Sequence, residues 1–235
     1  MNEIRKAATV KALELNDGEL GLINRQTIRP LSAEEVFAFR VAACDDQVDR
    51  DFERFTPAAL EGLAKLYVGK PLLSDHDWSA GKQAARVYAT SVEEESGVHR
   101  LVLRAYMLRS DITAPSIAAI EGGILREVSV GCAMGKAVCS ICGTDRMEKF
   151  CGHIPGKEYD GEVCHIDLDD PRDAYECSFV AVPAQPMAGV IKRYGGEGEP
   201  REDGDPGPEA EEEEALRLAR AKQEQEEKRY GGIEV

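Results

Sequence analysis

A cluster of cysteines constrains this chain more than any other feature of its sequence. Four of the seven cysteines lie in one short segment. Cys139 and Cys142 have the Cys-x2-Cys spacing that lets two thiolates bind one ion from a single tight turn. Cys151 and His153 follow and complete a tetrahedral Cys3His ligand set, with Cys164 as an alternative fourth ligand. The spacing therefore predicts a bound zinc ion.

The predicted zinc site is structural, because four protein ligands leave no open coordination position for a catalytic water. The insertion that contains it, residues 136–165, is polar and contains glycine, so it has little hydrophobic reason to fold without the ion. The alternative is a metal-free loop with incidental cysteines or a stray disulfide. Cys44, Cys132 and Cys177 lie inside strand-like runs and are expected to be small core residues.

Apolar runs and alternating patterns over the rest of the chain predict strands with a few helices. The expected strands are residues 36–44, 83–92, 99–108, 124–132 and 174–182. A helix should begin at Thr56-Pro57 and end before Gly69, and a shorter one should span about residues 115–120. Such a content favours an α+β fold that is mostly β, an antiparallel barrel or sandwich decorated by helices.

Composition divides the chain into three parts. Residues 1–34 carry few strong apolar positions and are expected to form an N-terminal arm with one or two strands. Residues 35–192 hold the core of the single predicted domain, into which the cysteine-rich segment is inserted. From residue 193 the sequence turns to glycine, proline and acidic residues, which is typical of a linker and a charged, conditionally helical tail.

The net charge of −15 is concentrated in this tail, where residues 197–235 include fourteen acidic and six basic side chains. Binding to duplex nucleic acid requires a basic face, so this charge argues against a nucleic-acid partner. No run approaches the roughly 18 apolar residues of a membrane helix. The first residues lack the basic start and apolar block of a signal peptide. We therefore expect no membrane partner and a cytoplasmic, reducing location.

Two polar residues in apolar surroundings are candidates for catalysis. His76 ends an apolar run and is flanked by Asp75 and Asp77. Ser129 lies in the middle of the strand-like segment EVSVG, where a hydroxyl is unusual. Each signal is weak alone, because a surface histidine or an incidental strand serine would also explain it.

Three segments in a fixed order resemble the tailed-phage prohead proteases, procapsid maturation serine proteases related to the herpesvirus assemblins. The region that leads into the catalytic histidine of that family is similar to VDRDFERFTPAALEGLAKLYVGKPLLSDHDW. The nucleophile strand resembles GGILREVSVGC, and the closing strand with its Pro-Ala-x-Pro exit resembles AYECSFVAVPAQPMAGV. The resemblance covers roughly residues 35–192. The cysteine-rich insertion lies between the second and third segments, as it does in some members.

The resemblance implies a closed antiparallel β-barrel of assemblin type, ringed by short helices. It also implies that Ser129 is the nucleophile and His76 its general base. Glu176, on the strand after the nucleophile, is the expected third member, because a carboxylate there would orient the imidazole. Asp173 and Asp75 are the alternatives for this role.

Other charged residues near these segments have less certain roles. Strand alternation places Glu127 on the same face as Ser129, which makes it a further candidate carboxylate. Arg126 and Arg86 are candidate helpers. The oxyanion hole needs backbone N–H donors, whose geometry a sequence does not give.

The expected function is a serine endopeptidase that cleaves scaffold or capsid-protein segments, and itself, during phage head assembly. Its expected partners are the phage scaffold and major capsid protein, with the portal and a second copy of the chain as further candidates. The expected location is the host cytoplasm, inside the assembling procapsid. The alternative is a non-enzymatic, zinc-containing assembly protein of scaffold type, which the charged tail favours. A zinc hydrolase is disfavoured by the closed ligand set.

Overall fold

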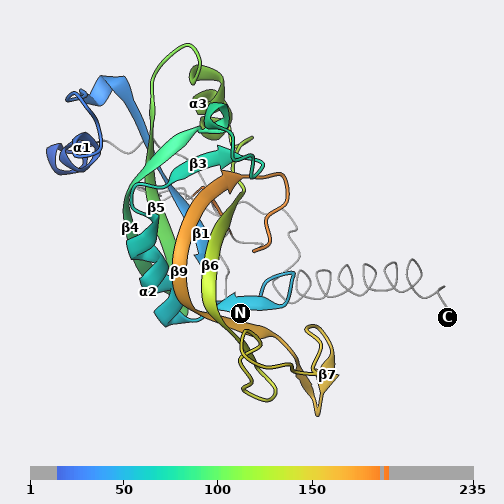
Figure 1. Ribbon diagram of the computed structural model, residues 1–235. Coiled ribbons are helices and arrows are strands. Elements are labelled where there is room, and N and C mark those ends of the chain that lie inside the picture. The colour runs from blue at the N-terminus through green and yellow to red at the C-terminus, as the bar shows by residue number, and fades with distance from the viewer. Residues whose placement is uncertain (1–14, 186–187, 191–235) are drawn as a thin grey trace.

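The computed structural model describes residues 15–185 and 188–190 of the chain. It is a mixed α+β fold, mostly strands with three α-helices, as the sequence predicts (Figure 1). The helices are α1 (Asp17–Asn24), α2 (Pro57–Tyr67) and α3 (Ala114–Glu121), with 3-10 turns η1 (Ala33–Glu35) and η2 (Ala80–Lys82). None of the helices in the described ranges combines the length and apolarity needed to cross a membrane.

Most strands belong to one eight-stranded sheet. Seven of its strands follow the order β10-β1-β5-β4-β3-β9-β2, and the eighth, β6, also pairs with β9. Its strands are β1 (Val36–Asp45), β2 (Glu53–Phe55), β3 (Pro71–Ser74), β4 (Ala85–Glu95), β5 (Val98–Leu108), β6 (Val128–Cys139), β9 (Ile166–Phe179) and β10 (Gly189–Val190). A separate hairpin is formed by β7 (Glu158–Tyr159) and β8 (Glu162–Val163).

The expectation of a wholly antiparallel sheet is wrong. β2 and β3 both pair with β9 in parallel, whereas β1, β4, β5, β6 and β10 make antiparallel pairs. Parallel pairs need long connections, and the chain between β3 and β9 provides one. The strand pairs of the described residues leave β10 and β2 at opposite ends of an open path. A bridge between Glu127 and Gly189 joins the segment before β6 to β10.

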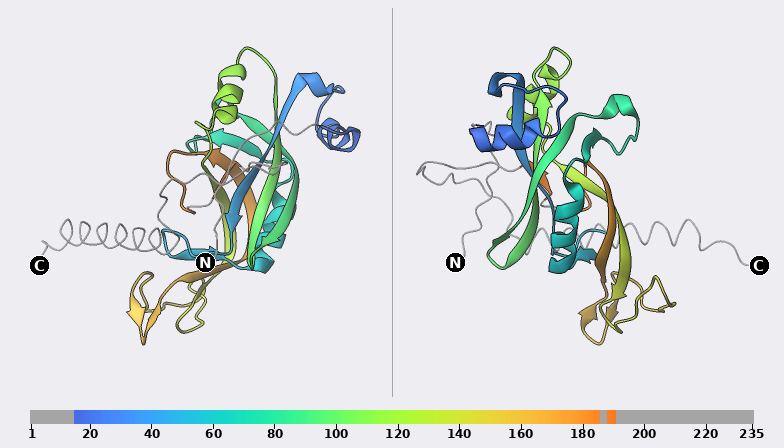
Figure 2. Two further views of the ribbon diagram at one scale, coloured as in Figure 1. Left: turned by 180° about the vertical axis from the view of Figure 1, so that it is seen from behind. Right: turned by 60° about the vertical axis from the view of Figure 1, so that its left-hand side comes forward.

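Helix α2 lies between strands β4 and β5 on one side and β9 on the other, as the right-hand view of Figure 2 shows. Its predicted apolar stripe, which includes Leu60, Leu63 and Tyr67, is fully buried in the main core. Thr56 begins the helix by accepting a hydrogen bond from the Ala59 N–H through its side chain. The sequence therefore predicts this helix, its cap and its buried face correctly.

Strand β1 is buried on both faces, as its apolar run predicts. Phe37 and Phe39 face the main core, whereas Val36 and Ala38 pack in a second cluster with Ile23 of α1. The described part of the arm contains helix α1 and not the expected strands. The Asn16 side chain caps this helix by accepting a hydrogen bond from the Glu19 N–H. Residues 1–14 and the predicted tail lie outside the described residues.

Strands β6 and β9 differ from their predicted bounds. The predicted strand 124–132 begins only at Val128 and continues to Cys139, and β9 begins at Ile166 instead of residue 174. These extensions pair with each other and carry the cysteine-rich insertion at their far end. Both views in Figure 2 place this insertion at one end of the molecule and α1 and α3 at the other.

Close packing of α2 on β9 gives a test of the fold. A Cβ at Gly62 would lie 2.4 Å from Cγ of Pro171, whereas a Cβ at Gly21 of α1 meets no atom within 4 Å. We expect Gly62→Ala to destabilise the protein by about 1–3 kcal/mol through this overlap. Gly21→Ala should instead stabilise it by about 0.5–1 kcal/mol through higher helix propensity. Urea unfolding of both variants measures the two effects, and a stabilised Gly62→Ala variant would contradict the packing.

Candidate functional site

Strand β9 brings the two predicted catalytic segments together. Ser178 of β9 pairs with Ser129 of β6 on one side and with Leu73 of β3 on the other. His76 follows directly after β3. Because adjacent strands lie about 5 Å apart, Ser129 and His76 flank the same stretch of β9.

The imidazole of His76 is held by a closed set of hydrogen bonds. Its Nδ1 lies 2.8 Å from Oε1 of Glu176. The Ser178 hydroxyl donates to Oε2 of Glu176 at 2.5 Å, and Ser178 Oγ accepts from the backbone N–H of His76 at 3.1 Å. Glu176 is only 2 % exposed and Ser178 is fully buried. The three residues therefore fix the histidine through both its ring and its backbone.

The backbone of the loop after β3 is left-handed at two consecutive residues. Asp75 has φ of 55° and His76 has φ of 53°. Residues other than glycine adopt this conformation at a cost, and such strain persists only where surrounding contacts impose it. Here the imposing contacts are the His76 bonds to β9 and the bond from the Asp75 N–H to the Phe179 carbonyl.

A glycine on β6 makes room for the carboxylate. Gly131 pairs with Glu176, and a Cβ at Gly131 would lie 2.4 Å from Oε1 of Glu176. The buried Tyr67 hydroxyl lies 3.1 Å from the Gly131 carbonyl oxygen and 3.3 Å from that of Glu176, so it can donate to either. Helix α2 therefore supports the two strands at the level of the carboxylate.

Ser129 lies next to this group but makes no hydrogen bond to His76 within the described part of the chain. It pairs with Ser178, and strand alternation turns it away from the core-facing Val128 and Val130. Catalytic hydrogen bonds are often unformed before substrate binds, so the spacing is compatible with a serine and base pair.

None of the alternative residues contacts His76 through its side chain, and most of them bind elsewhere. Asp173 forms an ion pair with Lys70 at 3.0 Å, which lowers the pKa of its carboxyl group. Glu127 pairs with Arg126. The guanidinium of Arg86 donates to the Gly69 carbonyl and to Gln83. Asp75 makes no side-chain hydrogen bond or ion pair with the other described residues. Of the candidate carboxylates, Glu176 is the one placed against His76.

The arrangement determines which nitrogen of His76 can act as a base. An ionised Glu176 accepts hydrogen bonds only, so Nδ1 carries the proton that points at Oε1. Nε2 is then the nitrogen with a free lone pair. A hydroxyl that reached Nε2 could transfer its proton there, and Glu176 would stabilise the resulting cation.

Ser178 is the residue of this candidate site that sequence reasoning missed. It lies two positions after Glu176, so strand alternation puts both side chains on one face. The signal was present in AYECSFVAV, where a glutamate and a serine at spacing two interrupt an otherwise apolar strand. Their direct hydrogen bond explains why both are buried.

A second cluster lies in the insertion beyond β6. The candidate ligand atoms of four residues all lie within 4.8 Å of one another: Cys139, Cys142, Cys151 and His153. The sulfurs of Cys142 and Cys151 are 3.4 Å apart, and two of the thiols approach Nδ1 of His153, to 3.7 Å for Cys139 and 3.3 Å for Cys151. Atoms around a tetrahedral zinc with bonds of about 2.0–2.3 Å are spaced similarly. This cluster can hold a metal ion, as predicted.

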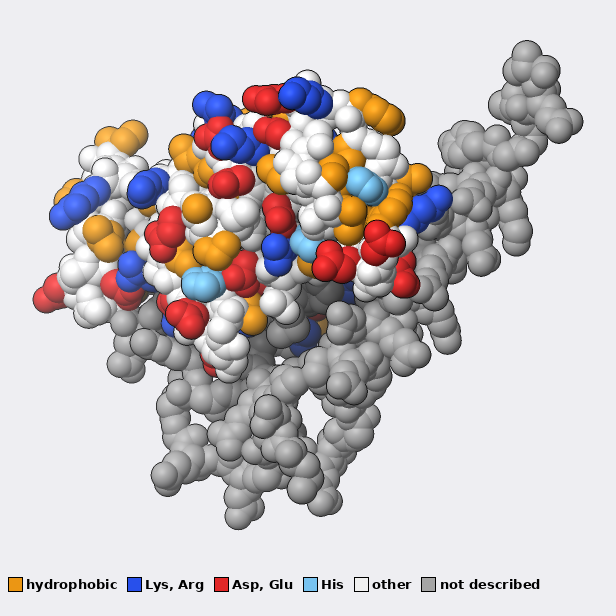
Figure 3. All heavy atoms as spheres, turned by 90° about the horizontal axis from the view of Figure 1, so that it is seen from below, with side chains coloured by type: hydrophobic (Ala, Val, Ile, Leu, Met, Phe, Trp, Pro, Cys, Tyr) orange, Lys and Arg blue, Asp and Glu red, His pale blue; other side chains and the backbone are white. Residues whose placement is uncertain are grey.

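The surroundings of the cluster suit a cation. All seven cysteines are free thiols. The Thr144 side chain, 3.2 Å from Sγ of Cys142, lowers the pKa of that thiol to about 6, which favours the thiolate that a metal requires. The His153 ring is steadied by an edge contact with Tyr159, whose centroid is 4.6 Å away. The face that carries the insertion shows acidic, basic and apolar side chains interspersed (Figure 3).

Cys164 lies beside this cluster without belonging to it. Its sulfur is 3.9 Å from that of Cys139, but it does not share the mutual spacing of the four residues. Burial raises the pKa of Cys164 to about 11. The three remaining cysteines pack in or against the main core, with Cys44 and Cys177 buried and Cys132 half-buried, as expected.

Comparison with known protein families, curated proteins and solved structures finds no match for this chain. The site is therefore interpreted from its own geometry.

The cluster predicts metal binding that depends on particular ligands. We expect about one ion per chain, lost in Cys151→Ser together with several degrees of melting temperature, because the ligands themselves make up most of the small buried cluster of the insertion. Cys132→Ser, outside the cluster, is the matched control and should keep the ion. Metal analysis and thermal melting measure both. Cys164→Ser should also keep the ion. If Cys164→Ser loses the ion and His153→Ala retains it, then Cys164 and not His153 is the fourth ligand.

Proposed function

We propose that the chain is a procapsid maturation protease, a serine endopeptidase in which Ser129 is the nucleophile and His76 the general base. The observation that carries the proposal is the bond between His76 Nδ1 and the buried Glu176, formed beside the strand that bears Ser129. A buried carboxylate is rare on a strand and costs stability unless it is hydrogen-bonded, and a carboxylate held against a histidine in this way is more frequent at functional sites.

The order and content of the three segments described above support the same proposal. The histidine, serine and glutamate that resemble catalytic positions of the prohead proteases come from three distant parts of the chain. β3, β6 and β9 are nevertheless adjacent strands. An unrelated protein with chance similarities would have no reason to place these three segments side by side.

In the proposed reaction, Ser129 Oγ attacks the scissile carbonyl carbon while His76 Nε2 takes its proton. The proton then passes from His76 to the leaving amine, and water repeats the sequence to release the acyl group. Glu176 keeps its charge throughout and stabilises the imidazolium. Ser178 holds the carboxylate in place through Oε2.

The remaining parts of the proposal concern the setting of the reaction. The sheet would be a barrel of assemblin type, closed near the Glu127–Gly189 bridge. The ion of the Cys3His cluster would be zinc in a structural role, because its four ligands leave no open position. The substrates would be the phage scaffold and major capsid protein, met inside the assembling procapsid in the host cytoplasm.

Cleavage should depend on both residues of the proposed pair. We expect Ser129→Ala and His76→Ala each to abolish processing when the chain is co-expressed with its phage's scaffold and capsid proteins. Ser91→Ala, a serine of β4 whose hydroxyl donates a hydrogen bond to Glu93, is the matched control and should process normally. Gels and intact masses follow the products.

Two other outcomes would contradict the proposal in different ways. Processing that persists in Ser129→Ala would mean that another residue is the nucleophile. A chain that enters procapsids but cleaves nothing in any version would instead support the non-enzymatic assembly protein.

The hydrogen bonds around Glu176 predict graded effects. Glu176→Gln keeps the shape but presents an amide to His76, so we expect a loss of at least about 100-fold in cleavage rate. Ser178→Ala removes only the contacts that fix the carboxylate and the loop, and should cost about tenfold. Single-turnover rates on a purified substrate, with circular dichroism to verify folding, measure both. Equal rates for Glu176→Gln and the unmodified chain would remove Glu176 from the site.

A further inference from the structure

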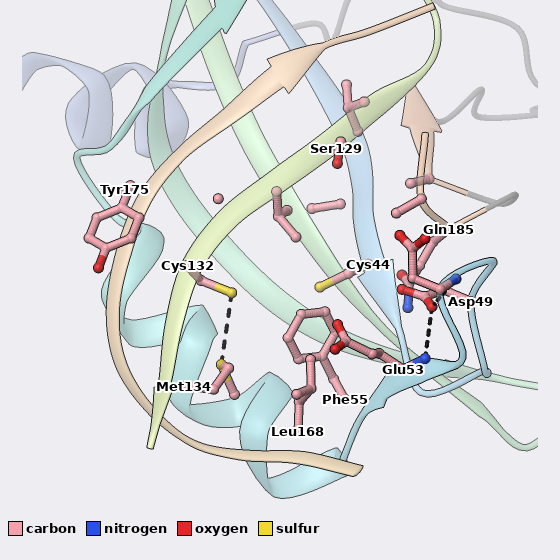
Figure 4. Close-up of a pocket in the computed structure, with 17 residues that line it drawn as sticks. Cys44, Asp49, Glu53, Phe55, Ser129, Cys132, Met134, Leu168, Tyr175 and Gln185 are labelled. Atoms are coloured by element: carbon pink, nitrogen blue, oxygen red, sulfur yellow. Dashed lines mark hydrogen bonds between the residues drawn. The ribbon is translucent and has the colours of Figure 1, made fainter. Parts of the chain in front are cut away.

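A cavity of about 390 Å³ adjoins the proposed nucleophile. Ser129 is on its wall, and its other walls come from β1, β2, the β9 strand and the residues Ala184, Gln185 and Ala188 (Figure 4). Beyond the pair with β9, no ladder among the described residues covers β6, so the cavity lies along its unpaired edge. The Ser129 side chain lies on the other face of β6 from Val130, so a side chain next to a scissile bond at Ser129 would enter this space over the open edge of the strand.

The middle of the cavity is apolar. Its wall on β6 is formed by Val130, Cys132 and Met134, and Phe55 and Leu168 face them from β2 and β9. Apart from Phe55, these side chains are only partly buried, although they pack against the main core. The flexible aliphatic part of a long side chain fits such walls, because its methylene groups leave water and contact apolar surface.

One end of the cavity is acidic. Asp49, Asp51 and Glu53 line it, and Figure 4 shows the Glu53 side chain extending from β2 toward the middle of the cavity beside the Phe55 ring. The Asp49 carboxylate is fixed in place, because its Oδ1 accepts from the backbone N–H groups of Asp51 and Glu53, both at 2.9 Å.

None of these carboxylates forms an ion pair among the described residues, and the one cation whose charge acts on Glu53 there is Arg146, which lowers its pKa by less than burial raises it. Burial raises the pKa of Glu53 and raises that of Asp49 to about 6. Burial and then the charge of Glu53 raise the pKa of Cys132 to about 11, so the field of Glu53 reaches the wall on β6. A cation in the cavity would offset this desolvation.

We propose that this cavity is the specificity pocket of the protease and that it accepts a lysine or arginine side chain next to the scissile bond. The apolar walls would contact the aliphatic stem, and Glu53 with Asp49 would bind the cationic head. The carboxylates line the same cavity as Ser129. The proposal of a substrate site rests on this shared cavity, because acidic residues alone would not indicate one. The inference rests on the proposed protease function.

Peptidyl diphenyl phosphonates test the inference on the purified full-length chain. These reagents transfer their phosphorus to a reactive serine: the Ser129 O–P bond forms, the P–O bond to phenoxide breaks, and phenol leaves with the serine proton. The set carries lysine-like, arginine-like, leucine-like and glutamate-like side chains, and intact mass follows a label that Ser129→Ala removes. We expect the basic reagents to label at least about tenfold faster than the other two.

Substitution of the carboxylates should reduce this preference. Glu53→Gln and Asp49→Asn keep the side-chain shape, and the amide oxygen that Asp49→Asn introduces can still accept the two backbone hydrogen bonds. We therefore expect the ratio of basic to leucine-like labelling to fall about tenfold in each variant. Glu61→Gln, an exposed glutamate of α2, is the matched control and should leave the ratio unchanged. Thermal melting verifies that each variant is folded.

The outcomes separate the two proposals. Labelling of Ser129 that is as fast with leucine-like or glutamate-like reagents, or a ratio unchanged in both carboxylate variants, overturns the pocket and leaves the protease proposal standing. Failure of every reagent to label the unmodified chain overturns both.

Discussion

The β9 strand is the element on which both candidate sites depend. It pairs with β6 along almost its whole length and also in parallel with β2 and β3. Its C-terminal half carries Glu176 and Ser178 and fixes the loop that contains His76. Its N-terminal half completes the hairpin that presents the Cys3His cluster. A shift in the register of this strand would therefore disturb both clusters at once.

Local sequence patterns predicted the helices and strands whose buried residues recur with a regular helical or strand spacing. The cap at Thr56, the stripe of α2 and the double burial of β1 could all be read from the sequence, because each depends on neighbours along the chain. The candidate metal cluster was predictable for a similar reason, since the ligand spacing is encoded in one short segment. The choice between His153 and Cys164 needed coordinates.

Long-range pairing was harder to predict. Nothing local in ERF or PLLS indicates that β2 and β3 pair in parallel with a strand about a hundred residues later, and helix α1 was missed because its capping asparagine precedes a weakly apolar segment. Ser178 was missed because its role appears only when β3 brings a backbone N–H to its hydroxyl. The acidic cavity likewise joins residues near position 50 with residues near position 130.

The order of these elements along the chain has a consequence for synthesis. His76 and Ser129 leave the ribosome before the insertion does, and among the described residues the strand with Glu176 is the last long element to emerge. A nascent chain that ends before β9 has neither the carboxylate that orients the histidine nor the strand that separates and aligns the other two segments. Translation itself thus delays the meeting of Ser129, His76 and Glu176 until nearly all of the described strands exist.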